Sequence, residues 1–117
     1  VLGERITFPQ GQADLLESFQ PTLRGIAAFI STHPGYRILI SGHTDNAPIN
    51  TTTFPSNWEL SAARAARVAR VLTENGIDPR RVAIHGYAQY SPLFENSTPE
   101  NREANRRVEI KLTREKG

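Results

Sequence analysis

The chain has 117 residues, 14 basic against 12 acidic side chains, and neither cysteine nor methionine. That length suits one domain over residues 1–117 and is short for two. A disulfide framework, a cysteine-ligated zinc site and a thiol nucleophile are therefore excluded. No apolar run reaches the roughly 18 residues that span a bilayer. Because the chain starts at Val1 and has no methionine, we expect it to be a fragment of a longer protein.

The first part of the chain alternates between strand-like and helix-like patterns. A short strand is expected at Arg5–Phe8. Apolar residues then recur at helical spacing and predict a helix that runs to about Thr32. Within this helix, Pro21 marks either a start at Gln20 or a kink. The next segment, Tyr36–Gly42, alternates and predicts a half-buried strand.

A long polar loop is expected over residues 43–55, which have little periodicity. Ser56 and Glu59 have the spacing of a capping box, with Ser56 as the N-cap. A helix is therefore predicted over Asn57–Glu74, and Asn75-Gly76 supplies its left-handed end.

The last part of the chain predicts two strands with a short helical turn between them. Asp78-Pro79 begins a single turn that leads into a strand over Val82–Tyr87. Thr98-Pro99-Glu100 begins another short helical turn, and the alternation over residues 108–112 predicts the final strand. The order is β-α-β-α-β-β, which indicates an α/β sandwich of two layers.

One arginine of the predicted helix over Asn57–Glu74 lies on its apolar face. At about 100° per residue, Arg70 projects away from that face, whereas Arg64 projects into it. The apolar residues that define this face are Leu60, Ala65, Val68, Val71 and Leu72. An unpaired buried guanidinium is costly. Arg64 therefore needs an anion, or it lies where the face opens into a cleft.

Asp45 is the acid nearest to this position in the expected fold, because it follows the strand Tyr36–Gly42. Ligands of open α/β sheets tend to bind at the carboxyl ends of strands. Two interpretations remain open. Arg64 and Asp45 form a structural ion pair, or both face a zwitterionic ligand that carries a carboxylate and an ammonium. In the second case Asn57 and Thr44 add hydrogen bonds at the rim.

A metal site is a further candidate, because His43 and Asp45 share a face of an extended strand and His85 follows the next strand. Such a site would indicate a metal-dependent hydrolase. The alternative is a hydrogen-bonded histidine at the end of a strand.

Other catalytic and nucleotide-binding classes lack their motifs. There is no nucleophile elbow, no dinucleotide-binding glycine motif and no phosphate-binding loop. Acids are interleaved with the arginines and no aromatics alternate with them, so nucleic-acid binding is not expected. We expect one arginine of Arg106-Arg107 to fold back onto loop carboxylates or carbonyls.

Four ordered blocks of this sequence resemble the OmpA-like peptidoglycan-binding domain, and the resemblance runs from Phe8 to Leu112. The blocks are Ser41-Gly42-His43-Thr44-Asp45-Asn46, Asn57-x-x-Leu60-Ser61-x-x-Arg64-Ala65-x-x-Val68, Gly86-Tyr87, and Asn105-Arg106-Arg107-Val108-Glu109-Ile110. Within the family, the long loop from Asp45 to Ser61 is most similar to that of the MotB-like flagellar stator subunits.

The resemblance implies a mixed sheet with helices on one face and a noncatalytic module without cofactor or metal. Such modules hold the diaminopimelate residue of the peptidoglycan stem peptide. At matching positions, Asp45 would bind the ammonium of diaminopimelate and Arg64 its carboxylate. Asn57 and Thr44 would line the same pocket, and its walls would be Leu60, Ala65 and the chain near Phe8.

The resemblance to MotB-like proteins also implies a location and partners. The chain would be the periplasmic domain of a bacterial inner-membrane protein and would anchor the flagellar stator to the cell wall. A MotA-like subunit would bind through an N-terminal part outside this chain, and the protein would be a homodimer. The alternative is the anchor domain of a secretion-system component or of an outer-membrane protein or lipoprotein.

Four positions at three places in the chain depart from the family pattern. Ala88 replaces a common glycine after Gly86-Tyr87. Asn101 replaces another usual glycine, and asparagine tolerates left-handed geometry. Pro9-Gln10 follows Phe8 where many members have an acidic or small residue, which affects one wall of the pocket.

Overall fold

The computed structural model describes residues 5–15 and 17–114. Its four strands form one sheet in the order β1-β4-β2-β3. The sheet is mixed, because β2 pairs in parallel with β3 and antiparallel with β4, while β1 pairs antiparallel with β4. The strands are β1 (Arg5–Thr7), β2 (Tyr36–Gly42), β3 (Val82–Gly86) and β4 (Arg107–Arg114). These results confirm the predicted strands, with small shifts at their ends.

The helices lie where the periodicity predicts them. The kink that Pro21 allowed is not present, because α1 begins at Gln20 and Pro21 lies in its first turn. The α-helices are α1 (Gln20–Ser31), α2 (Asn57–Glu74) and α3 (Pro99–Asn105), and short 3-10 turns cover Glu17–Phe19 (η1) and Pro79–Arg81 (η2). None of these described helices has the length and apolar character that a membrane crossing requires.

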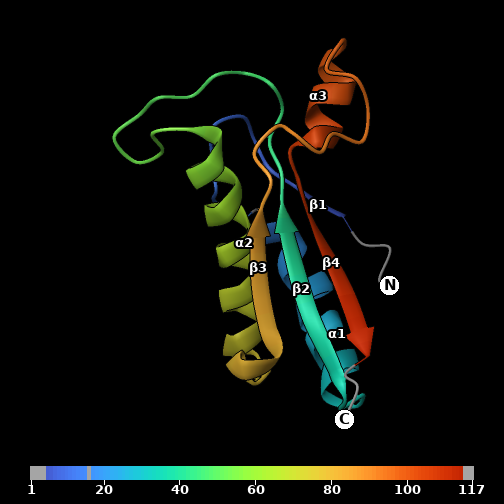
Figure 1. The fold of residues 1–117 in the computed structure, drawn as a ribbon. Coiled ribbons are helices and arrows are strands. Elements are labelled where there is room, and N and C mark those ends of the chain that lie inside the picture. The colour runs from blue at the N-terminus through green and yellow to red at the C-terminus, as the bar shows by residue number, and fades with distance from the viewer. Residues whose placement is uncertain (1–4, 16, 115–117) are drawn as a thin grey trace.

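The two long helices cover one face of the sheet and form the second layer, as Figure 1 shows. The apolar faces of α1 and α2 pack on the inward residues of β2 and β4, for example Ile40 and Ile110, which are almost completely buried. The period of 3.6 in the helices and of two in the strands places these residues on facing surfaces. The expected two-layer arrangement is confirmed.

Capping residues set the start of α2, and its position decides where Arg64 lies. The Ser56 hydroxyl accepts a hydrogen bond from the Trp58 backbone N–H and donates one to the Glu59 carboxylate. Ser56 is therefore the N-cap, as predicted, although Glu59 binds the Ser56 hydroxyl rather than its backbone N–H. At the other end Gly76 adopts a φ of +98°, the left-handed end that Asn75-Gly76 predicted.

Two glycines let α2 approach the sheet closely. Gly42 and Gly86 are paired across β2 and β3 and both face Ser61. A Cβ atom on Gly42 would lie 1.9 Å from the Ser61 carbonyl oxygen, which no side chain can tolerate. This close contact fixes the first turns of α2 against the carboxyl ends of β2 and β3. Arg64 lies one turn further along α2.

Candidate ligand-binding site

A cavity of about 310 Å³ lies next to the first turns of α2, beyond the carboxyl end of β2. Five of the residues that the sequence proposed for a site line it: Thr44, Asp45, Asn57, Leu60 and Arg64. The loop after β2 and the start of α2 contribute these side chains. The volume is at the lower end of the range for small-molecule sites.

Arg64 forms the base of the cavity and is completely buried. Its guanidinium donates three hydrogen bonds to backbone carbonyls: Nε to Gln12 at 2.8 Å, Nη1 to His43 at 2.9 Å and Nη2 to Pro9 at 2.9 Å. Burial lowers the pKa of Arg64 to about 10, although the nearby Asp45 carboxylate opposes this shift. Arg64 is thus a cation at neutral pH, held in place by neutral partners.

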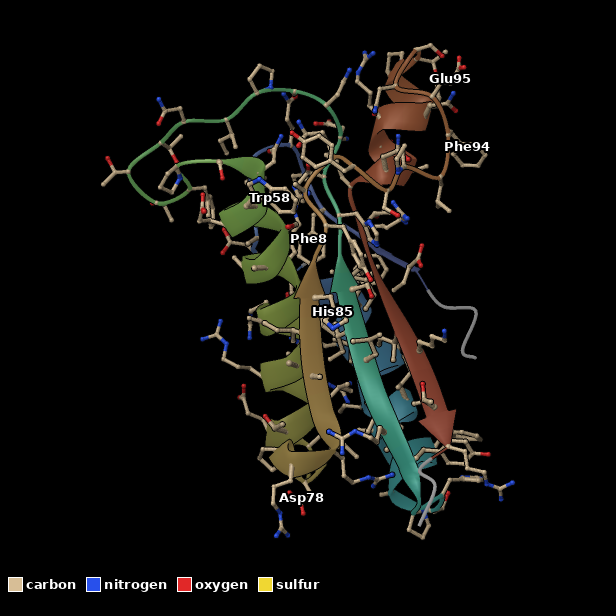
Figure 2. All side chains as sticks on the ribbon, viewed as in Figure 1. Phe8, Trp58, Asp78, His85, Phe94 and Glu95 are labelled. Carbon is tan, nitrogen blue, oxygen red and sulfur yellow. The ribbon has the colours of Figure 1, made fainter. Side chains whose placement is uncertain are left out.

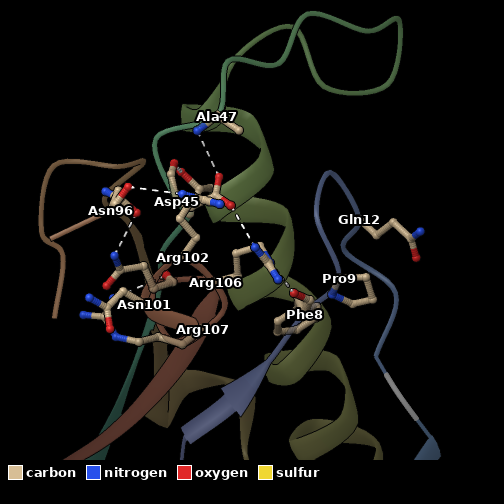
Figure 3. Close-up of polar contacts among 12 residues, drawn as sticks. Phe8, Pro9, Gln12, Asp45, Ala47, Asn96, Asn101, Arg102, Arg106 and Arg107 are labelled. Carbon is tan, nitrogen blue, oxygen red and sulfur yellow. Dashed lines mark hydrogen bonds and ion pairs between the residues drawn. The ribbon is translucent and has the colours of Figure 1, made fainter. Parts of the chain in front are cut away.

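Asp45 is also buried and its direct partner is Arg106. Its Oδ2 accepts from Arg106 Nη1 at 2.9 Å, and its Oδ1 accepts from the Ala47 N–H at 3.0 Å. Figure 3 shows the carboxylate between these two donors. The Arg64–Asp45 ion pair that the sequence allowed is therefore not formed. Arg64, Arg106 and Asp45 together carry a net charge of +1.

Two further polar residues of the lining, Thr44 and Asn57, hold the loop after β2 in shape. Thr44 Oγ1 donates to the Asp45 carbonyl at 2.8 Å, and Asn57 Nδ2 donates to the Ala47 carbonyl at 3.2 Å. The Asn57 contact connects the first residue of α2 to the loop ten residues earlier. Both side chains therefore position Asp45 as well as lining the cavity.

Phe8 and Ala65 lie behind the cavity and are not part of its lining. Phe8 is buried, and the Arg64 guanidinium lies 5.3 Å from the centre of its ring. Ala65 is buried where α2 packs on the Gly42 position. Both residues support the base of the cavity from the core side.

Sequence reasoning did not single out several other residues of the site. These are the lining residues Gly11, Ala47, Pro48 and Ile49. Gln10 belongs to the pair that the resemblance placed at one wall, and Arg106 to the pair that was expected to fold back onto a loop carboxylate. Gly11 has a φ of +69°, so the chain turns there and its carbonyls can reach Arg64. The Pro9-Gln10 departure from the family pattern falls in this same segment. Pro9 contacts Arg64 through its backbone carbonyl, and this acceptor is present whatever the side chain at that position.

The left-handed backbone position is at Ala88 and not at Asn101. Ala88 has a φ of +54°, the only positive value among the described residues that are not glycine. A left-handed backbone position favours glycine, which is the residue that the family resemblance implies here. Asn101 lies within α3 and does not adopt left-handed geometry, so the reason given for tolerating it was wrong.

His43 does not combine with His85 and Asp45 in a metal site. No group of three histidine, cysteine or acidic side chains in the described part of the chain could hold a metal ion. The His43 ring is buried and stacks on Tyr87, with centroids 5.1 Å apart, and its Nδ1 has no hydrogen-bond partner among the described residues. Burial and the charge of Arg107 lower the pKa of His43 to about 4, and Glu109 opposes the shift. The prediction of a hydrogen-bonded histidine was therefore wrong for Nδ1, and the His43 ring packs by stacking on Tyr87.

The segment Asn105-Arg106-Arg107 connects α3 to β4, and its side chains contact the loop after β3 and the loop after β2. Arg106 folds back onto Asp45 and the Phe8 carbonyl, which confirms the prediction for this pair. Arg107 binds Glu109 and donates to the Ser91 carbonyl at 3.0 Å. The buried Asn105 amide accepts from the Leu93 N–H and donates to the Phe94 carbonyl. The motif thus closes the loop and positions Arg106 toward the cavity.

The chain belongs to the OmpA family, whose model matches residues 7–106. It is similar to Motility protein B of Bacillus subtilis, with 39% identity over 92% of this chain and 41% of that protein. The solved C-terminal domain of Helicobacter pylori MotB has 31% identity and a TM-score of 0.89, covering 97% of this chain and 87% of that one. The cell wall anchor of the type VI secretion system of Pseudomonas aeruginosa has 38% identity and a TM-score of 0.81, covering 93% and 75%.

These matches confirm the family resemblance and the expected fold. This chain spans less than half of the length of the first curated relatives that it matches. The family membership therefore applies to this domain, and it does not extend to the other parts of those longer relatives.

Proposed function

We propose that this domain binds the peptidoglycan stem peptide without catalysis and holds it by the diaminopimelate residue. One observation carries the proposal: Asp45 and Arg64 line the same cavity, and their direct partners are other groups. A ligand in the cavity can therefore approach both charges. Diaminopimelate carries an ammonium and a carboxylate on the same carbon, which suits an acid and a guanidinium within one small cavity.

The charges of the site favour a ligand carboxylate. Among the residues that the structure describes, Arg64 donates to carbonyls only, so no acid of this part of the chain neutralises its positive charge by direct contact. A guanidinium has five N–H donors, and three of them have partners here. A ligand carboxylate would use the remaining donors. The ligand ammonium would bind Asp45, whose oxygens each have a free lone pair beside their present donors.

The anchored assembly is, in our proposal, the flagellar stator. The similarity to Motility protein B and to the C-terminal domain of MotB supports this choice. The chain would then be a periplasmic domain of an inner-membrane protein, active as a homodimer and joined to a MotA-like subunit through segments outside this chain.

A secretion-system anchor is the second candidate, because the type VI cell wall anchor has a comparable identity to this chain. Both candidates use the same site and the same ligand. The sequence upstream of this domain in the full-length protein separates them: a single membrane helix with an ionisable acid supports the stator, and a lipoprotein signal supports an envelope anchor.

Sedimentation with purified peptidoglycan tests the binding function. The wild-type domain should sediment with the wall, and free diaminopimelate should release it. Asp45→Asn keeps the shape of the side chain and removes its charge, so we expect apparent affinity to fall about tenfold or more. Arg70→Ala is the matched control, because Arg70 is exposed on the same helix as Arg64.

Circular dichroism should show that each variant is folded before binding is compared. A folded Asp45→Asn variant that sediments like the wild type would contradict the role of Asp45. Binding that free diaminopimelate does not compete would contradict the proposed ligand.

A further inference from the structure

A second depression adjoins the cavity and has a different chemical character. It is a groove of about 210 Å³ that shares Pro48, Ile49 and Asn57 with the cavity. Its other walls are Ser56, Trp58, Gln89 and Tyr90. We call it the aromatic groove. Because the two depressions have three residues in common, a ligand longer than diaminopimelate can extend from one into the other.

Two exposed aromatic side chains define the aromatic groove. Trp58 is 53% exposed and Tyr90 is 66% exposed, and their ring centroids lie 5.3 Å apart with the planes inclined by 34°. Figure 2 shows Trp58 at the cavity end of α2, where the long loop enters the helix. Two adjacent large aromatic side chains exposed to water are unfavourable, and such exposed apolar patches often mark binding sites.

We propose that the aromatic groove is a second subsite, which binds an N-acetylated amino sugar of the glycan strand. This inference rests on the proposed binding of the stem peptide in the cavity. In peptidoglycan the peptide is attached to the sugar by its first residue, and diaminopimelate is the third. An extended chain of that length spans roughly 10 Å, so a sugar must lie close to any bound diaminopimelate.

The chemistry of the aromatic groove fits a neutral sugar better than a charged group. None of its lining residues carries a charge at neutral pH, whereas the cavity contains Asp45 and Arg64. The faces of Trp58 and Tyr90 can pack on the C–H face of a pyranose ring, and their N–H and O–H groups can serve its hydroxyls. Gln89 supplies an amide for the N-acetyl group. Aromatic walls with a few polar groups are typical of such sites.

Intrinsic fluorescence tests the proposal directly, because Trp58 is the only tryptophan of the chain. The 117-residue chain is titrated with the diaminopimelate-containing tripeptide, with the same tripeptide linked to its disaccharide, and with the disaccharide alone. Calorimetry gives the affinities. We expect the linked compound to bind about tenfold more tightly than the tripeptide, which equals 1.4 kcal/mol. It should also change Trp58 emission more than the tripeptide does.

Variants locate the effect in the aromatic groove. Tyr90→Ala keeps the fluorescent reporter and should lose the tenfold advantage of the disaccharide, with tripeptide affinity unchanged. Trp58→Ala should do the same by calorimetry. Phe94→Ala is the matched control, because Phe94 is a similarly exposed aromatic outside both depressions, and it should retain the advantage.

The outcomes separate this proposal from the function on which it rests. Equal affinities of the wild type for the tripeptide and the linked compound would overturn the sugar subsite and leave the stem-peptide site intact. An unchanged advantage in Tyr90→Ala and Trp58→Ala would also overturn it. If the wild type ignores the tripeptide but Trp58 responds to the disaccharide alone, the sugar subsite stands and the proposed stem-peptide site fails. If Trp58 responds to neither sugar compound, the subsite is overturned.

Discussion

Acidic and basic side chains meet at both ends of the sheet, but their surroundings differ. Beyond the carboxyl end of β2, Arg106 and Asp45 form an ion pair with both side chains largely buried, and Arg64 is buried beside them. At the opposite end, Asp78 and Arg80 pair at 2.8 Å, with the Arg80 side chain 90% exposed. Figure 2 shows Asp78 at this lower end.

The difference shows how burial decides what a charge does. Around the exposed pair, water and salt screen the charges, and the Asp78 carboxylate mainly caps η2 by accepting from the Arg80 N–H. In the cavity, desolvation makes every charge costly unless it has partners. The fold supplies those partners with carbonyls and one ion pair, and a positive charge remains that a ligand can use.

The largest effect should come from Arg64→Ala. This change removes the guanidinium that donates to the carbonyls of Pro9, Gln12 and His43, and among the described residues only the Pro9 carbonyl keeps another donor, the Gln12 N–H. We therefore expect the free energy of unfolding to fall by about 3–5 kcal/mol. Chemical denaturation measures it, with Arg70→Ala as the exposed control on the same helix. If the free energy of unfolding fell equally in the two variants, burial would not be the reason for the contribution of Arg64 to stability.

The pH dependence of stability should reveal the contribution of His43, which is buried at the same end of the sheet as Arg64. Because its pKa is about 4 in the folded protein and about 6.5 in an unfolded chain, the unfolded state binds more protons between these values. Stability is therefore present above pH 6.5 and is lost as the pH falls toward 4, by about 3 kcal/mol in total. Denaturation at a series of pH values measures the slope.

His43→Phe provides the control for this pH dependence. Phenylalanine can keep the stacking on Tyr87 and cannot be protonated, so the slope between pH 6.5 and 4 should become shallower. A variant with the full wild-type slope would assign the effect to other groups.

The smallest effect should come from Asp78→Ala at the exposed end. Hydrogen bonds from Arg80 lower the pKa of Asp78 to about 2. Its contribution is therefore present above the ordinary carboxylate pKa and is lost only as the pH falls toward 2. At pH 7 we expect a small decrease in the thermal midpoint and no change in sedimentation with peptidoglycan. A loss as large as that of Arg64→Ala would remove the contrast between the two ends.

Local patterns in the sequence were sufficient for the elements and for the buried position of Arg64, one of the five proposed residues that line the cavity. Hydrophobic periodicity and the signals at Ser56, Gly76 and Asp78 predict the helices and most strand boundaries. The projection of α2 also isolates Arg64 as a buried cation, because its neighbours along the helix are apolar. These inferences depend on residues within a few positions of one another, where backbone geometry is regular.

Only the tertiary structure decided how the charges are paired. Arg64 lies more than 50 residues from Pro9 and Gln12, and Asp45 lies 61 residues from Arg106. The segments that bring these groups together are loops, whose course no periodic pattern describes. The left-handed conformation of Ala88 and the close approach of Gly42 to Ser61 likewise follow from tertiary packing and not from a local sequence pattern. The sequence alone determined that a buried cation needs partners, because that cost is local; which partners it has depends on long-range packing.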